Sequence, residues 1–168
     1  MRSTLIRMLI IRKGNINDID AIADIEMKCF PAAEAASKSV IESRMNAFPS
    51  HFYVAQIDGE VIGFVNGLVS NEKTISDDMF ENASFHNEKG KYQMIFGLDV
   101  LMEYRRKGIA HRLIQAMINS AKAEGRTGIV LTCKYELITF YEKMGFKKKG
   151  ASKSIHGGAV WYDMELIL

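Results

Sequence analysis

The sequence predicts an α/β domain in which helices alternate with the strands of a mixed sheet of about seven strands, flanked by about four helices. Two observations support this fold class. Apolar residues recur every three or four positions in some segments, as in amphipathic helices, and alternate or run continuously in others, as in strands. At 168 residues the chain suits a single domain spanning residues 1–168, with residues 1–7 as an extension outside the fold.

The first strand is predicted at Leu9–Ile11. A helix follows within residues 15–30, because isoleucines recur there at helical spacing and an asparagine stands where it can cap the start. Pro31 ends this helix, and a second helix is expected over residues 32–48.

The middle of the chain is expected to form strands around one long loop. Apolar and polar residues alternate over residues 51–70 around Asp58-Gly59, which is a strong signal for a β-hairpin. Residues 71–90 are polar, acidic and weakly periodic, so a long loop with one helical turn is expected there. An apolar central strand follows at residues 92–101.

The last third is expected to continue the alternation. Gly125 and Gly145 are placed to end two helices, because glycine is favoured just after a helix C-terminus. The expected elements are a helix at 109–124, a strand at 128–133, a helix at 136–145, and closing strands at 146–150 and 159–168.

Composition excludes several functional classes. The 22 Lys and Arg nearly balance 20 Asp and Glu, so the chain lacks the strong basic charge of a nucleic-acid-binding domain. No apolar run approaches the roughly 18 residues of a membrane span. Cys29 and Cys133 lack CxxC spacing, so no metal site or disulfide framework is expected, and free thiols fit a cytoplasmic protein.

A basic stretch from Tyr104 to Ala110, "YRRKGIA", stands between the central strand and the helix after it. Gly108 has no Cβ, so backbone N–H groups there can approach a ligand closely. The first N–H groups of a helix attract anions, and three basic side chains add charge at the same place. The stretch is therefore interpreted as a phosphate-binding loop, although it matches neither GxxxxGK[ST] nor GxGxxG.

This stretch resembles the R-x-x-G-x-G/A signature of the GNAT superfamily of acyl-CoA-dependent N-acetyltransferases. "FYEKMGF", from Phe140 to Phe146, lies at the distance where that family carries its second motif, and the predicted element order matches from about Ile10 onward. The resemblance implies the GNAT fold and an enzyme that uses acetyl-CoA as co-substrate without a metal.

A narrower resemblance concerns "CFPAAEAAS", "LTCKYELITFYEKMGF" and "SIHGGAVWYDM". These segments look like those of the serotonin (arylalkylamine) N-acetyltransferase-like branch and its bacterial relatives. That branch implies direct transfer of the acetyl group to a small primary amine. The resemblance also allows a homodimer, because GNAT domains commonly dimerise.

By the same resemblance, backbone N–H groups of residues 106–110 hold the pyrophosphate of CoA, and its pantetheine arm lies along the central strand. The Leu98 N–H is the expected donor to the oxyanion, and Phe140 is expected to be core or cofactor wall. The implied cofactor-binding set is Leu98, Asp99, Val100, Arg105, Arg106, Lys107, Gly108, Ile109, Ala110, Phe140 and Tyr141.

For proton transfer, the family pattern places the general acid at Tyr141. The two strand histidines of the vertebrate serotonin enzymes are replaced by Met94 and Phe96, so the base must be another group or a water chain. The candidates are Glu26 on the first helix and His156 beside two glycines.

Other interpretations stay open at this point. The missing histidines keep a non-catalytic GNAT-fold sensor of CoA or a metabolite as an alternative to the enzyme. The acidic residues of the 71–90 loop are either solvated surface or a lid that attracts a cationic amine. The residues expected to form an adaptable apolar wall are Met27, Met45, Met79 and Phe80.

Overall fold

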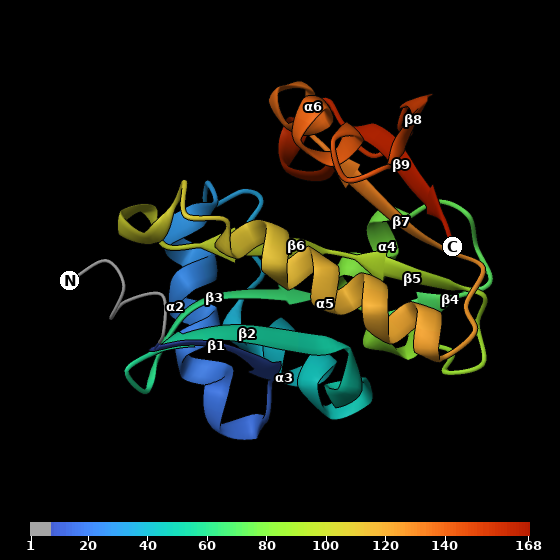
Figure 1. The fold of residues 1–168 in the computed structure, drawn as a ribbon. Helices are drawn as coiled ribbons and strands as arrows, with labels where there is room; N and C mark the ends of the chain where they lie inside the picture. The colour runs from blue at the N-terminus through green and yellow to red at the C-terminus, as the bar shows by residue number, and fades with distance from the viewer. Residues whose placement is uncertain (1–7) are drawn as a thin grey trace.

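The computed structural model describes residues 8–168, so the expected extension at 1–7 lies outside the described residues (Figure 1). The described part holds a four-stranded and a five-stranded sheet. The first, antiparallel sheet has the order β1 (Leu9–Lys13), β2 (Phe52–Ile57), β3 (Glu60–Asn66), β6 (Gly97–Val100). The second has the order β4 (Val69–Ser70), β5 (Tyr92–Ile95), β7 (Gly128–Cys133), β9 (Tyr162–Ile167), β8 (Lys147–Ala151), with β5 and β7 parallel. The α/β class is confirmed.

The two strands beyond the expected number arise from breaks in longer segments. The second strand of the hairpin is interrupted at Gly67, where a Cβ would collide with the carbonyl of Met94 on the neighbouring strand. The predicted central strand divides at Phe96 into β5 and β6, which belong to different sheets. Periodicity cannot detect the second break, because both halves are apolar.

Helices cover both faces of the first sheet (Figure 1). Helices α2 (Ile19–Cys29) and α3 (Lys38–Ala47) share one apolar core with Val54 and Phe64 of the sheet. Helix α5 (Ile109–Ala123) packs on the opposite face, where Ala55 and Val65 point. The alternation of these strand residues between two cores follows from the two-residue repeat of a strand.

The helix expected over residues 32–48 begins later, at Lys38. Its start is set by Ser37, whose hydroxyl oxygen accepts a hydrogen bond from the Val40 N–H at 3.3 Å. Residues 31–37 therefore lie outside the helix and form a loop with one turn, in which the Ala35 N–H donates to the Pro31 carbonyl at 3.0 Å. A short helix α6 (Ile138–Glu142) replaces the longer helix expected at 136–145.

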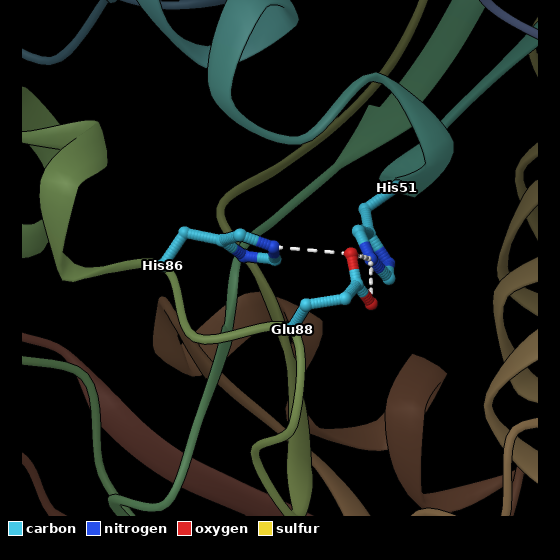
Figure 2. A group of neighbouring side chains, drawn as sticks. All are labelled: His51, His86 and Glu88. Atoms are coloured by element: carbon cyan, nitrogen blue, oxygen red, sulfur yellow. Dashed lines mark hydrogen bonds and ion pairs between the residues drawn. The ribbon is translucent and has the colours of Figure 1, made fainter.

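The long segment 71–90 contains helix α4 (Asp77–Glu81), as expected of a loop with one helical turn. The C-terminal end of this segment is anchored by Glu88, which lies between the rings of His51 and His86 (Figure 2). The Glu88 carboxylate accepts hydrogen bonds from His51 Nε2 at 2.9 Å and from the Arg126 guanidinium at 2.7 Å. His51 is 1% exposed and Arg126 9% exposed, so Glu88 supplies a charged acceptor to two buried side chains.

Two imidazoles and a carboxylate are also a common metal-ligand set, but the hydrogen bonds oppose that role. His86 Nδ1 accepts a hydrogen bond from the Val69 N–H at 3.1 Å, so the ring proton of neutral His86 is on Nε2. That nitrogen faces Glu88 at 3.2 Å as a donor and has no lone pair for a metal ion. The cluster is an anchor for the loop.

We predict that Glu88→Gln lowers stability by about 1–3 kcal/mol at neutral pH, because it removes the charged acceptor of buried His51 and one of the two carboxylates that pair with Arg126. Thermal unfolding measures this loss as a lower Tm. Burial by itself would raise the pKa of Glu88, but hydrogen bonds from His51 and His86 hold it below its ordinary value. The stabilisation is therefore complete above that ordinary value and disappears as pH falls below about 4.

The matched control is Glu72→Gln, since Glu72 is an exposed residue of the same segment. At every pH its Tm should stay close to that of the wild-type protein. Equal Tm values for the Glu88→Gln and Glu72→Gln proteins at neutral pH would contradict the anchor.

Candidate active site

A cavity of about 330 Å³ opens where β6 separates from β7. Strands β5 and β7 pair only as far as Ile95 and Leu131, and after Phe96 the chain pairs with β3 instead. The four residues that the sequence placed in catalytic roles, Glu26, Leu98, Tyr141 and His156, all line this cavity. The structure thus brings together residues from α2, β6, α6 and the β8–β9 loop.

Strand β6 presents part of its backbone to this opening. The Leu101 N–H donates to Ile62 of β3 at 2.9 Å, and amide directions alternate along an antiparallel strand. The N–H groups of Leu98 and Val100 therefore point away from β3 and toward the divergent side. The Asp99 amide faces β3, so Asp99, which the resemblance places in the cofactor-binding set, turns its N–H away from the opening.

Tyr141 forms part of the cavity wall with its ring packed edge-on against Phe140 and Phe146. Burial raises the pKa of the Tyr141 phenol far above its ordinary value. The hydroxyl therefore keeps its proton at neutral pH and can donate it. Phe140, expected at the core or cofactor wall, packs against the α5 core and is not among the cavity-lining residues.

Glu26 is held in the cavity wall by the loop after α2. Its Oε2 accepts a hydrogen bond from the Ala36 N–H at 2.9 Å, and the residue is 6% exposed. Its Oε1 lies toward Gly97 of β6, since a Cβ built on Gly97 would be 3.4 Å from that oxygen. Glu26 is therefore a fixed, nearly buried carboxylate beside the strand that carries the Leu98 N–H.

The sequence interpretation gave no catalytic role to the side chains of two polar residues of this region. The side chain of Asp99, 2% exposed, faces Glu26, and Arg44 of α3, 5% exposed, lines the cavity. The Arg44 guanidinium donates to Asn66 Oδ1 and to the Phe80 carbonyl and lies over the ring of Phe96. Burial lowers the pKa of Arg44 to about 10, so it remains a cation at neutral pH.

His156 connects two loops that line the cavity. Its Nε2 donates to the Glu34 carbonyl at 2.9 Å, and its ring stacks on Phe80. Lys134 of the β7–α6 loop forms an ion pair with the Glu34 carboxylate at 2.9 Å. The α2–α3 and β8–β9 loops therefore meet over the cavity, and only Nδ1 of His156 is left to act as a base.

The basic stretch has the backbone shape expected of an anion site. Gly108 has φ +78° directly before α5, and Arg106 has φ +62°. The side chains of Arg106 and Lys107 are exposed. Arg105 differs from the expectation, because its Nε donates to the Val100 carbonyl at 2.8 Å and its guanidinium reaches Cys29. Its charge therefore lies at the end of β6.

The acidic loop and the apolar wall differ in part from their expected roles. Asp77 accepts hydrogen bonds from the Ser154 hydroxyl and the Ile155 N–H, so it ties α4 to the β8–β9 loop. Phe80 lines the cavity, as expected of the wall. Met27 is 72% exposed on the outer face of α2, so its assignment to the wall is wrong.

Known relatives identify the family. Residues 19–146 match the acetyltransferase (GNAT) family, and the chain belongs to it. It is 30% identical to an N-alpha-acetyltransferase of Saccharolobus solfataricus over 82% of this chain and 80% of that protein. It is 27% identical to the probable hydrolase YhcX of Bacillus subtilis over 74% of this chain but only 26% of that protein. The chain spans half or less of the first curated relatives that it matches.

Solved structures confirm the GNAT fold. The GphF GNAT-like decarboxylase in complex with isobutyryl-CoA superposes with a TM-score of 0.82 at 17% identity, over 94% of this chain and 98% of that chain. Because this neighbour is a decarboxylase, the fold by itself does not determine the reaction. The resemblance to the serotonin N-acetyltransferase-like branch stays a prediction. Among the described residues, no helix is long and apolar enough to cross a membrane.

Proposed function

We propose that this protein is an acetyl-CoA-dependent N-acetyltransferase that moves the acetyl group directly to a small primary amine. The observation that carries the proposal is the convergence of Leu98, Tyr141 and Glu26 on one cavity at the β6–β7 divergence. Acetyl transfer needs an oxyanion donor, a proton donor for the thiolate and an acceptor for the amine proton, and these three residues offer them in one place.

The donor would be held at two points. The pyrophosphate fits the left-handed turn at Gly108 and the N-terminus of α5, where backbone N–H groups and a helix dipole favour an anion. The pantetheine arm would add to the open side of β6 through Leu98 and Val100. The Leu98 N–H then points at the thioester oxygen, and such a donor typically contributes roughly 3 kcal/mol in the transition state.

Direct attack is favoured over an acyl-cysteine intermediate. Cys133 lines the cavity, but burial raises the pKa of its thiol to about 11. Cys29 also lines the cavity, and burial raises the pKa of its thiol as well. A thiol attacks as its thiolate, which both sites disfavour at neutral pH. The amine itself is the better nucleophile here, and Tyr141 supplies a proton to the departing CoA thiolate.

The enclosure of the cavity supports a small acceptor. A volume of about 330 Å³ is at the low end for ligand pockets, and the end of the pantetheine arm must share it. The contact between His156 and Glu34 joins the two loops that cover the acceptor side. A peptide acceptor, as implied by the name of the archaeal relative, would require these loops to separate.

The proposal is tested by following free thiol release from acetyl-CoA with a panel of small primary amines, a panel of short peptides and a blank without amine. We expect release with one or more small amines and none above background in the blank. Release only with peptides would contradict the small acceptor. Tight CoA binding with no release for any acceptor would favour the non-catalytic sensor.

We predict that Gly108→Ala weakens acetyl-CoA binding at least tenfold, because an added Cβ stands where the pyrophosphate must meet the backbone. A tenfold change in Kd corresponds to a loss of about 1.4 kcal/mol of binding free energy. Isothermal titration measures the Kd. The control is Gly125→Ala at the other end of α5, which has a similar φ of +74° against +78° and equally open surroundings. Both variants should lose similar stability. An equal loss of acetyl-CoA affinity in both would contradict the assignment of residues 106–110 as the phosphate-binding loop.

We predict that Tyr141→Phe lowers kcat by about 10²-fold, near the lower end for general acid catalysis, and leaves the acetyl-CoA Kd nearly unchanged. The ring and its packing remain, and only the proton donor is lost. The control is Tyr135→Phe, since Tyr135 is 71% exposed and does not line the cavity. A wild-type kcat for Tyr141→Phe from pH 6 to 10 would exclude the general acid role.

A further inference from the structure

We propose that Asp99 and Glu26 form a buried carboxyl pair that shares one proton, and that Asp99 positions Glu26 as the group that receives the proton of the acceptor amine. This inference rests on the proposed function and deepens it. It selects Glu26 over His156 as the base and gives a role to Asp99, a strand residue whose carboxylate oxygens have no hydrogen-bond partner among the described residues.

The geometry places the two carboxyls against each other. Asp99 of β6 and Glu26 of α2 both face the space above Gly97, where a built Cβ would lie 3.6 Å from Asp99 Oδ1 and 3.4 Å from Glu26 Oε1. The two side chains are close enough to hydrogen-bond once either carries a proton. Glu26 lines the cavity and Asp99 lies behind it, so only Glu26 can reach the amine.

The surroundings make a single shared proton the favourable state. Neither carboxylate oxygen of Asp99 has a hydrogen-bond donor among the described residues, and the side chain is almost fully buried. Two adjacent buried carboxylates repel each other, so one of them retains a proton. Burial and the neighbouring Glu26 raise the pKa of Asp99 well above its ordinary value.

The other ionisable groups around Asp99 have opposing effects on its charge. Two cations favour the ionised pair, and a thiol and a phenol near it do not. These groups are Arg44 of α3, Arg105 of the loop after β6, Cys29 of α2 and Tyr141 of α6. Arg44 compensates one negative charge of the pair, which leaves the second charge to attract a cationic amine.

Proton transfer then follows in one step. The pair loses its shared proton to solvent, and an ammonium acceptor enters the cavity. One N–H bond of the ammonium breaks with its electron pair staying on nitrogen, and an O–H bond forms on Glu26. The product is a neutral amine beside a pair that again holds one proton, and the amine can attack the thioester.

His156 is less suited to this step. Its Nε2 proton is committed to the Glu34 carbonyl, and its ring is stacked on Phe80. A proton taken up by Nδ1 has no carboxylate acceptor in the contacts that the structure describes. Its contacts are those of a residue that joins the two loops.

The test is the pH profile of kcat at saturating acetyl-CoA and amine. Activity should rise with pH as the pair loses its shared proton. In Asp99→Asn the neighbouring negative charge is gone, so the repulsion that makes the pair retain a proton is removed. We expect the rising limb to move by about one pH unit or more toward acid, with a plateau about tenfold lower because Glu26 is then a weaker base.

Two control variants separate this role from a structural one. Asp163→Asn alters a different, partly buried carboxyl, on β9, whose pKa burial also raises, and it should leave the rising limb of the pH profile in place. His156→Asn should leave the rising limb of the kcat profile at the same pH, whether or not its maximal kcat changes. A limb that is unmoved in Asp99→Asn, or that moves in His156→Asn instead, would overturn the proposal.

Titration of the wild-type protein tests the pair without turnover. Carbon-13 NMR of the Asp and Glu carboxyls should show one group of the pair still protonated after the exposed carboxyls have ionised. Ionisation of both groups together with the exposed carboxyls would overturn the proposal even if Asp99→Asn fails to fold. Failure of the proposed function is a different result, namely no acetyl transfer by the wild type to any amine.

Discussion

The separation of β6 from β7 is the constraint on which the rest of this structure depends. Within one continuous segment, residues 92–95 pair with β7 and residues 97–100 pair with β3, so the two sheets diverge at Phe96. Backbone hydrogen bonds that would have joined the sheets are left open on one edge of β6. Backbone N–H and C=O groups on a buried strand edge cost free energy unless a ligand or water hydrogen-bonds to them. The open edge of β6 therefore suits an extended ligand that carries amide groups.

The same divergence brings charged groups into a small interior space. Glu26, Asp99 and Arg44 come from α2, β6 and α3, and each is at most 6% exposed. Isolated buried charges are strongly unfavourable, so their retention near one cavity is an expected mark of a functional site. The two loops that meet through His156 and Glu34 cover this space and limit its contact with water.

The sequence predicted most of the fold and named four catalytic candidates that line the candidate cavity. Helix α5, the hairpin at Asp58-Gly59 and the turn at Gly108 follow from local periodicity and glycine placement, which sequence reports directly. Tyr141 and Leu98 followed from a family pattern. Asp99 was named only as part of the cofactor-binding strand, and Arg44 was not named at all. The surroundings of a strand aspartate and of a helix arginine cannot be inferred until the partner elements are known. Arg105 was expected to add charge at the phosphate-binding loop. Its hydrogen bond to Val100 could not be foreseen, because that bond depends on the path of the loop after β6.

The central claim is that the open side of β6 receives the pantetheine arm of acetyl-CoA. Residue-resolved amide hydrogen exchange, measured by NMR with and without acetyl-CoA, tests it most directly. The account predicts that acetyl-CoA slows exchange at Leu98 and Val100, whose N–H groups point to the opening, and changes little at Asp99, whose amide already faces β3. Unchanged exchange at Leu98 and Val100 under conditions where acetyl-CoA is bound would contradict it.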